Sequence, residues 1–322
     1  MKRIAVLTSG GDAPGMNAAV RAVVRTAFEN EIEVYGVMGG YQGLLESDFI
    51  SMDLRTVSNI IQRGGTILHS ARSEEFKTME GTLKARDVLE KYGIENVVVI
   101  GGDGTLAGGN RLAGTGVSVV GIPATIDNDV GCSDLTIGYD TAMNTVMSMV
   151  DRLRDTTEAH KRCSVVEVMG RDAGYIALNS GIAVGAVSIL IPEVEYDIQR
   201  DVVDRMNRTL HYGKNHFIII VAEGAGDSEK ISKRIKEATG IETRLTVLGH
   251  VQRGGSPTVN DRVLGSQFGH EAIQLIKKIN DKSSYALGYI NKKIVSYPLE
   301  EALKIKKPMD MELYKVANEI SI

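Results

Sequence analysis

Two clusters that contain threonine and aspartate each follow a short apolar run. The first, Gly101-Gly102-Asp103-Gly104-Thr105, follows residues 97–100 (VVVI), and the second, Thr125-Ile126-Asp127-Asn128-Asp129, follows residues 117–123 (VSVVGIP). Such runs are typical of strands that are buried on both faces of a parallel sheet. Because open α/β sheets bind ligands at the carboxyl ends of their strands, we expect both clusters to line one ligand site.

Glycine-rich loops between a strand and a helix suit phosphate, because they expose backbone N–H groups beside the positive end of the helix dipole. The chain has two such loops, at Gly10-Gly11 and at residues 101–109, where five glycines stand although a tight turn needs only one or two. A carboxylate among phosphate-binding amides would repel the ligand unless a divalent cation lay between them. Asp103 is therefore predicted to bind Mg²⁺.

The pair Asp127 and Asp129 points the same way if its segment is extended. Two like charges need a metal, a cationic partner or a catalytic proton to coexist. A base that accepts the proton of an attacking sugar hydroxyl, beside a carboxylate that helps to hold metal-bound phosphate, meets this need and indicates a kinase. The alternative is a cluster of Asx turns that caps a loop.

Other nucleotide-binding motifs fit less well. The sequence has no G-x-x-x-x-G-K-[ST], which excludes a P-loop enzyme. Gly102-x-Gly104-x-x-Ala107, with Asp127 20 residues beyond Ala107, matches a dinucleotide-binding pattern. Asp127 falls past the end of its strand, however, so a dehydrogenase is only a weak alternative.

Composition narrows the class of protein. The 322 residues carry a formal net charge of -4 and no dense Lys/Arg tract, which argues against nucleic acid as a partner. No secretory signal and no apolar span near 18 residues is found, so we expect no membrane association and a cytoplasmic location. The two cysteines, Cys132 and Cys163, lack metal-ligand spacing and are predicted to be structural.

Strand-like and helix-like segments alternate along the chain, which predicts an α/β fold with mainly parallel sheets, and the length of 322 residues suggests two domains. The predicted strands are 4–7, 34–38, 97–100, 117–123, 164–169, 187–191 and 217–221, and the clearest helices are 16–30 and 140–154.

Two further patterns are weaker. Residues 62–66 (QRGGT) recur almost unchanged as 252–256 (QRGGS), which indicates either two related halves or equivalent backbone corners in both. The charged run 304–307 (KIKK) is most simply a solvated face.

Six ordered motifs together resemble the ATP-dependent 6-phosphofructokinases of the bacterial type, over nearly the whole chain. NAD kinases and diacylglycerol kinases share only the second of these motifs. The six are residues 8–17 (TSGGDAPGMN), 101–105 (GGDGT), 123–129 (PATIDND), 169–171 (MGR), 222–224 (AEG) and 248–257 (LGHVQRGGSP).

The resemblance implies an α/β fold of two similar Rossmann-like domains with mainly parallel sheets, helices on both faces and the active site in the cleft between them. It implies a larger ATP-binding domain at 1–138 with a return segment at about 252–305, and a smaller fructose 6-phosphate-binding domain at 139–251 with the C-terminal segment at about 306–322.

The reaction that the resemblance implies is phosphoryl transfer from ATP to the 1-hydroxyl of D-fructose 6-phosphate. The resemblance makes Asp127 the base, assisted by Thr125, Asp129, Arg171, Arg72 and Gly11, and makes Asp103 the Mg²⁺ ligand. The implied ATP contacts are Gly11, Tyr41, Arg72, Ser73, Gly102, Asp103, Gly104, Thr105 and Gly108. The implied sugar phosphate contacts are Thr125, Ile126, Asp127, Arg162, Met169, Gly170, Arg171, Glu223, Arg244, His250, Val251, Gln252 and Arg253.

The identity of the phosphoryl donor follows from two positions. Relatives that use pyrophosphate usually carry aspartate where Gly104 stands and lysine where Ala124 stands, so ATP is favoured here. ATP-using relatives more often have glycine in place of Ala124. A kinase of the same fold that uses pyrophosphate or another sugar phosphate, and a catalytically silent nucleotide sensor, remain as alternatives.

The family further implies a homotetramer in which Arg162 and Arg244 reach the 6-phosphate across a subunit interface. Its effector site, also between subunits, is matched here by Arg21, Arg25, Arg154 and Lys214. Four other effector positions depart from the usual residues, so we expect a weak response to ADP and phosphoenolpyruvate. These positions are Leu54, Asn59, Val187 and Tyr212.

Overall fold

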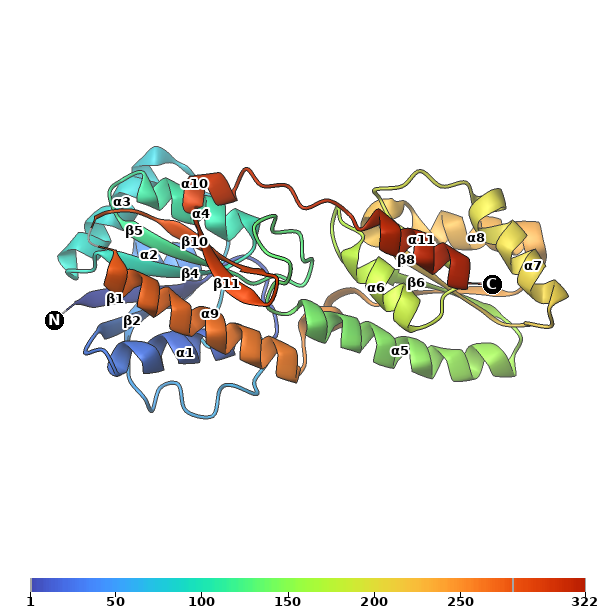
Figure 1. Cartoon of the computed structure of the whole chain (residues 1–322), viewed down its shortest axis with the longest axis horizontal. Helices are drawn as coiled ribbons and strands as arrows, with labels where there is room; N and C mark the ends of the chain where they lie inside the picture. Colours follow the sequence, from blue (N-terminus) through green and yellow to red (C-terminus); the bar gives the residue numbers. More distant parts are fainter. Residues whose placement is uncertain (1, 280, 322) are drawn as a thin grey trace. The chain divides into compact units, whose positions relative to one another are not determined.

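The computed structural model describes residues 2–279 and 281–321. Its contacts divide the chain into two compact units (Figure 1). The first unit comprises Met1–Thr141 and Arg253–Lys307, and the second comprises Ala142–Gln252 and Pro308–Ile322. Each unit is an α/β structure with its own sheet and its own apolar core.

The first unit contains a seven-stranded sheet in the order β11-β10-β5-β4-β1-β2-β3. The five strands from β10 to β2 run parallel, and antiparallel strands β11 and β3 close the two edges. The strands are β1 (Arg3–Thr8), β2 (Glu33–Val37), β3 (Phe49–Met52), β4 (Asn96–Gly101), β5 (Ser118–Pro123), β10 (Tyr285–Ile290) and β11 (Lys293–Pro298).

The central strands β4 and β5 are buried along their whole length, as their continuous apolar sequences predict. Helices α3 and α4 cover one face of the sheet, and α1 and α9 lie side by side on the other (Figure 1). The helices of this unit are α1 (Met16–Phe28), α2 (Gly40–Glu46), η1 (Glu75–Lys77), α3 (Met79–Lys91), α4 (Asp103–Ala113), α9 (Val259–Lys278) and α10 (Leu299–Ala302).

Helices α1 and α9 pack backbone to backbone through small residues. An ideal Cβ at Gly265 would lie 2.9 Å from the carbonyl oxygen of Gly15, and one at Gly269 would lie 2.5 Å from that of Ala19. Real Cβ atoms do not come so close to backbone, so only glycine fits at these two positions of α9. The close packing fixes the start of α1, and therefore the glycine loop before it.

The second unit contains a fully parallel sheet in the order β7-β8-β6-β9. Alternate residues of β6 and β8 face a core that η2, α7 and α8 complete. The strands are β6 (Cys163–Val168), β7 (Ser188–Leu190), β8 (Phe217–Ala222) and β9 (Thr243–Val247). The helices are α5 (Tyr139–Ala159), which starts in the first unit, α6 (Tyr175–Ala183), the π-helix η2 (Gln199–Val203), α7 (Asp204–His211), η3 (Glu223–Ala225), α8 (Ser228–Thr239), η4 (Gly249–Arg253) and α11 (Met311–Ile320).

All seven predicted strands are present, and both predicted helices start within one residue of the expected position. The prediction of mostly parallel α/β sheets is confirmed. The sequence patterns missed β3, β9, β10 and β11, three of which lie at sheet edges. Edge strands are held mainly by backbone pairing, so half-exposed sequences such as β11 lack the apolar run of a central strand.

The repeated QRGG segments do not mark two halves of the chain. Gly64 and Gly255 both belong to the first unit, and an ideal Cβ at Gly64 would lie 2.3 Å from the carbonyl oxygen of Gly255. The two segments therefore pack against each other, so the first of the two interpretations, a copy in each of two related halves, does not hold.

None of the helices in the described residues has the length and apolar character needed to span a membrane.

Candidate active site

Three polar loops of the first unit leave neighbouring strands at the same edge of the sheet. The register pairs Thr8 with Ile100 and Gly101 with Pro123, so β1, β4 and β5 end side by side. The chain passes from β1 to β2 on one side and reaches β4 on the other, which makes the gap between β1 and β4 the topological switch point of the sheet. Open α/β sheets bind ligands at such points.

The two glycine loops are tied together across this switch point. The Thr105 hydroxyl donates to the Ser9 carbonyl oxygen at 2.9 Å, and the Ser9 N–H donates to the Ile100 carbonyl oxygen at 3.1 Å. Gly10 has a φ of +82°, a backbone conformation that favours glycine, and its carbonyl oxygen accepts a 2.6 Å bond from the Ser70 hydroxyl. The loop is thus held from both sides with its backbone at the sheet edge.

The start of α4 has the features of a phosphate site. Gly102 is the N-cap, and Asp103 and Gly104 are exposed at the first two helical positions. An ideal Cβ at Gly104 would have no protein atom within 4 Å, so open space lies beside the helix N-terminus. N–H groups and the helix dipole favour an anion there.

The oxygen ligands near Asp103 suit a metal ion that binds together with a phosphate-containing substrate. Among the residues that the structure describes, no group of three or more His, Cys, Asp or Glu side chains could hold a metal ion by itself. Mg²⁺ does not need such a group, because it commonly takes one or two carboxylates, several waters and the phosphates of a substrate. The exposed carboxylate of Asp103 at a phosphate-binding helix end is compatible with that mode.

The residues 125–136, here called the aspartate loop, carry the second cluster. Thr125, Ile126 and Asp127 are buried, Asp127 completely, whereas Asp129 is partly exposed. The Asp127 N–H donates to the Thr125 hydroxyl at 3.2 Å. The predicted base is therefore held within the protein, four residues after the end of β5.

Asn128 shapes this loop, although its role was not predicted. It has a φ of +54°, and its side-chain oxygen accepts a 3.0 Å bond from the Thr136 N–H. The Thr136 hydroxyl donates to the Thr125 carbonyl oxygen at 2.6 Å, so the two ends of the loop meet. Asparagine tolerates this left-handed conformation better than most residues, which is the signal in the sequence that could have identified it.

The remaining predicted nucleotide residues differ in exposure. Tyr41 is buried, stacks on Phe76 at 4.0 Å between ring centroids, and donates to the Thr105 carbonyl oxygen at 2.6 Å. An ideal Cβ at Gly108 of α4 would lie 2.6 Å from the Tyr41 ring, so the glycine allows Tyr41 to pack directly against the helix. Arg72 is exposed and Ser73 is partly exposed.

Arg253 lies against the first glycine loop. Its Nη1 is placed 3.4 Å from the carbonyl oxygen of Asp12 and would be 2.2 Å from an ideal Cβ at Gly11. The structure thus brings together Gly11, residues 102–105, residues 125–129 and Arg253 within the first unit. This group combines backbone N–H donors, carboxylates and one guanidinium.

A second group of predicted residues gathers at the carboxyl ends of β6 and β8 in the second unit. One carboxylate oxygen of Glu223 accepts the N–H groups of Gly170 at 3.1 Å and Arg171 at 2.6 Å. The Met169 N–H donates to the buried Gln252 side chain at 3.2 Å. His250 and Val251, on η4, are exposed. Glu223 and Gln252 therefore hold the 169–171 turn in place by accepting bonds from its N–H groups.

Arg162 and Arg244 lie at the opposite end of the same sheet. Arg162 directly precedes β6, and Arg244 pairs with Ser164 at the start of that strand. Glu242 joins the two, with N–O distances of 3.3 Å to Arg162 and 2.6 Å to Arg244. Burial tends to raise the pKa of Glu242, but the two guanidinium groups outweigh it and hold that pKa below its usual value.

Because β6 has six residues, these arginines lie roughly 20 Å from the 169–171 turn. The structure therefore does not bring all predicted sugar phosphate residues together within one copy of the second unit.

The predicted effector residues form two pairs, one in each unit. Arg21 and Arg25 lie on α1, where burial and the charge of Arg25 lower the pKa of Arg21. Burial and the charge of Arg154 lower the pKa of Lys214 in the second unit, and Arg154 donates to the Val184 carbonyl oxygen. Of the four departures, Val187 is fully buried, Tyr212 and Asn59 are exposed, and Leu54 is intermediate.

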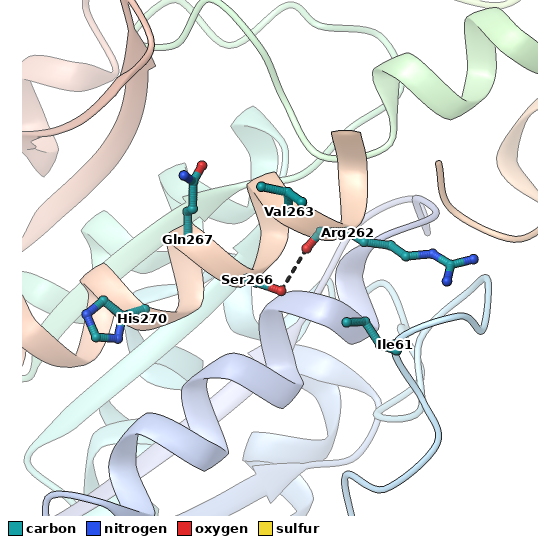
Figure 2. A pocket seen from close by; sticks show the side chains of 6 residues that line it. All are labelled: Ile61, Arg262, Val263, Ser266, Gln267 and His270. Carbon is teal, nitrogen blue, oxygen red and sulfur yellow. Dashed lines mark hydrogen bonds between the residues drawn. The ribbon is translucent and has the colours of Figure 1, made fainter. Parts of the chain in front are cut away.

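A surface hollow of about 340 Å³ lies on the outer side of α9 (Figure 2). Its lining includes no carboxylate, no lysine and no predicted site residue, so it offers no phosphoryl transfer chemistry. The lining residues are Ile61, Arg262, Val263, Ser266, Gln267 and His270.

Lys307 was missed by the sequence analysis, which placed residues 304–307 on a solvated face. The side chain is partly buried, and its ammonium group donates to the carbonyl oxygens of Ser133 at 2.9 Å and Asp134 at 2.8 Å, both in the aspartate loop. For Lys307 the expectation is wrong, because a lysine in a charged run carries no sequence signal of burial. Lys304 and Lys306 are exposed as expected.

Comparison with known proteins identifies the family. The sequence profile described as "Phosphofructokinase" matches residues 3–276. The chain is 52% identical over 325 residues to the ATP-dependent 6-phosphofructokinase of Clostridium tetani and 51% identical over 322 residues to that of Halalkalibacterium halodurans, and each match covers 100% of both chains.

A solved structure of phosphofructokinase from Saccharomyces cerevisiae superimposes with a TM-score of 0.93 at 35% identity. That match covers 98% of this chain and 50% of the yeast chain, so the present chain spans about half the length of the yeast one. With a profile that matches most of its length and full-length relatives at about half identity, this chain belongs to the phosphofructokinase family.

Proposed function

We propose that this protein is an ATP-dependent 6-phosphofructokinase, a phosphotransferase of glycolysis. It transfers the γ-phosphoryl group of ATP to the 1-hydroxyl of D-fructose 6-phosphate and yields fructose 1,6-bisphosphate and ADP. The observation that carries the proposal is the meeting of two glycine loops and the aspartate loop at the switch point of the larger sheet, in a chain about 50% identical to curated enzymes of that name.

In the proposed reaction Asp127 accepts the proton of the 1-hydroxyl as that oxygen attacks the phosphorus. Asp127 is fully buried, so a substrate hydroxyl reaches it only after surrounding side chains have moved. Thr125 orients the base through the bond between its hydroxyl and the Asp127 N–H. Positioning and electrostatic stabilisation supply most of the catalysis in phosphoryl transfer, so no covalent nucleophile is needed.

The phosphates of ATP are proposed to bind the N–H groups of residues 102–105 and the Gly10-Gly11 loop, with Arg72 and Ser73 beside them. ATP-dependent phosphofructokinases generally need a divalent metal ion. We assign Mg²⁺ to this role and Asp103 as its ligand, since an exposed carboxylate at a helix N-terminus matches the ligands that Mg²⁺ takes. When bound, the ion neutralises charge on the phosphates.

The sugar phosphate is proposed to bind the 169–171 turn, Glu223 and His250 in the second unit, together with Arg253. Arg171 and Arg253 have planar guanidinium groups, which can bind phosphate through two hydrogen bonds at once (bidentate binding). Gln252 keeps the turn in place through Met169.

The open space beside Gly104 favours ATP over pyrophosphate, because ATP has an α-phosphate to place there. A coupled assay with fructose 6-phosphate tests this: we expect turnover with ATP and little or none with pyrophosphate at equal concentration. Turnover with pyrophosphate alone would favour the alternative donor, and turnover with neither would refute the proposed function.

We further propose a homotetramer with active sites shared between subunits. The separation of Arg162 and Arg244 from the 169–171 turn, roughly 20 Å along β6, supports this. Both groups contact one sugar phosphate only if the arginines come from a second copy of the chain.

The effector pairs Arg21 with Arg25 and Arg154 with Lys214 are proposed to meet in the same way, between subunits. Val187 is buried and has no oxygen in its side chain for a metal ion, so ADP with its cation is expected to act weakly. We also propose a cytoplasmic location, which is compatible with the two free buried thiols of Cys132 and Cys163.

A further inference from the structure

The aspartate loop is closed on itself but needs outside contacts to fix its place on the sheet. Asn128 and Thr136 join its two ends, and the Asn128 amide also donates to the Asp134 carbonyl oxygen at 3.2 Å. These bonds hold the shape of the loop. They do not determine where Asp127 stands relative to the glycine loops.

Two distant segments of the first unit provide the outside contacts. At the end of β10, the Tyr289 N–H donates to the Ser133 hydroxyl at 2.9 Å, and the Asp134 N–H donates to the Tyr289 carbonyl oxygen at 2.8 Å. The segment 305–307 lies directly on the loop, since an ideal Cβ at Gly131 would stand 1.9 Å from the Ile305 carbonyl oxygen.

Lys307 makes charged contacts from that segment to the loop backbone, through the carbonyl oxygens of Ser133 and Asp134. Its neighbours differ, because Lys304 pairs with Glu300 at 2.7 Å and Lys306 is exposed. Lys307 is also the last residue of the first unit before the chain passes to the second at Pro308.

The electrostatic surroundings of Lys307 are mostly acidic. Burial lowers its pKa to about 8, whereas the charges of Asp134, Asp129 and the Cys132 thiol act to raise it. Burial raises the pKa of the Cys132 thiol to about 11, and the charges of Asp103 and Lys307 also act on this pKa. The ammonium group of Lys307 therefore lies near enough to Asp129 for the charge of that carboxylate to act on it.

We propose that Lys307 is a positioning residue for phosphoryl transfer, one that fixes the aspartate loop in place. A charged donor to two carbonyl oxygens is stronger than neutral hydrogen bonds, so its loss frees the loop more than the loss of one backbone contact. A misplacement of about 1 Å at a reacting group costs on the order of 10²-fold in rate. The role rests on the proposed function, since it is a role for Asp127 and Asp129 in that reaction.

The first arm of the test is kinetic. Lys307→Met should lower kcat about 10- to 100-fold while KM for ATP and for fructose 6-phosphate changes less than about threefold, because Lys307 touches the loop and not a substrate. Lys307→Arg should recover most of kcat, since guanidinium also donates to two oxygens and keeps its charge. Lys306→Met, on the same segment, is the matched control and should keep wild-type kcat.

The second arm uses no substrate. Amide hydrogen exchange of residues 125–136 in the ligand-free proteins should be about tenfold faster in Lys307→Met than in Lys306→Met or Lys307→Arg, with other segments unchanged. Wild-type kcat in Lys307→Met overturns the proposal, and so does unchanged exchange in the loop. A wild-type protein that does not turn over ATP and fructose 6-phosphate would refute the proposed function instead, and the exchange arm distinguishes the two failures.

Discussion

The guanidinium group of Arg253 occupies the space that a side chain on Gly11 would need, with Nη1 2.2 Å from an ideal Cβ at that position. The two residues are more than 240 positions apart, yet both lie in the first unit, at the loop after β1. The obstacle is the far end of a flexible side chain. A methyl group on Gly11 would therefore displace Arg253 and leave the backbone in place.

Gly11→Ala is expected to keep the fold and to impair the enzyme through Arg253. KM for fructose 6-phosphate should rise about tenfold or more, as it should in Arg253→Ala, because a lost phosphate contact to a charged group is worth about 1.5–3 kcal/mol. The double variant should be little worse than either single variant. Steady-state kinetics of the two single variants and the double variant give the coupling energy between Gly11 and Arg253. Additive effects on KM would show that Gly11 acts independently of Arg253.

Gly104→Ala tests the donor site without disturbing the protein. An added Cβ there meets no protein atom within 4 Å, and alanine stabilises a helix by about 1 kcal/mol relative to glycine. Thermal stability should be equal or slightly higher. KM for ATP should rise about tenfold or more if a phosphate of ATP occupies that space, while KM for fructose 6-phosphate stays within about threefold. Normal ATP kinetics would place the nucleotide elsewhere.

Arg162→Ala and Arg244→Ala should each raise KM for fructose 6-phosphate far more than KM for ATP, since each removes a phosphate contact. Arg200→Ala, which removes an exposed arginine paired with Asp201, is the control and should change neither value.

The shared site has a further consequence that can be measured. Mixed oligomers of Arg162→Ala and Asp127→Ser chains should regain activity, because one kind of site in them combines the intact Arg162 of one chain with the intact Asp127 of another. If mixed oligomers of verified composition stay inactive, the sugar phosphate site does not cross a subunit interface.

The buried carboxyl of Asp261 should make stability depend on pH. Burial raises its pKa to about 6, against the bonds that the Thr141 hydroxyl and the N–H groups of Gly138 and Thr141 donate to it. The folded state then holds this proton more tightly than the unfolded state, whose pKa is 3.8. Its stabilisation is complete below about pH 4 and is lost as pH rises through about 6, by at most about 3 kcal/mol.

Thermal unfolding of wild type and Asp261→Asn from pH 4.5 to 7.5 measures this effect. The advantage of the wild-type protein should shrink as pH rises, because asparagine does not titrate. An advantage that grows with pH would mean that the donors of Gly138 and Thr141 hold Asp261 ionised in the folded protein.

The sequence was informative where one physical rule dominates. The runs 97–100 and 117–123 are mostly apolar because β4 and β5 are buried on both faces. The positions of these strands in turn predicted where the glycine and aspartate clusters lie, after the carboxyl ends of the strands. β10 and β11 were missed, since β10 contains Gly288 and β11 is half exposed and ends in Pro298.

Contacts that join distant segments had no local signal. Neither the meeting of Gly64 with Gly255 nor the bonds of Lys307 to the aspartate loop could be seen in the sequence, because both depend on how remote segments pack. The place of Arg162 and Arg244 at the amino ends of β6 and β9 likewise required the sheet register.

The central claim is that Asp127 accepts a proton from fructose 6-phosphate during transfer from ATP, and Asp127→Ser tests it most directly. In protein that keeps the wild-type fold and its affinity for ATP, kcat for fructose 6-phosphate should fall about 10²- to 10⁴-fold or more, or roughly 3 to 5 kcal/mol in activation free energy. A kcat near that of the wild type, measured in such a folded and ATP-binding variant, would contradict the claim.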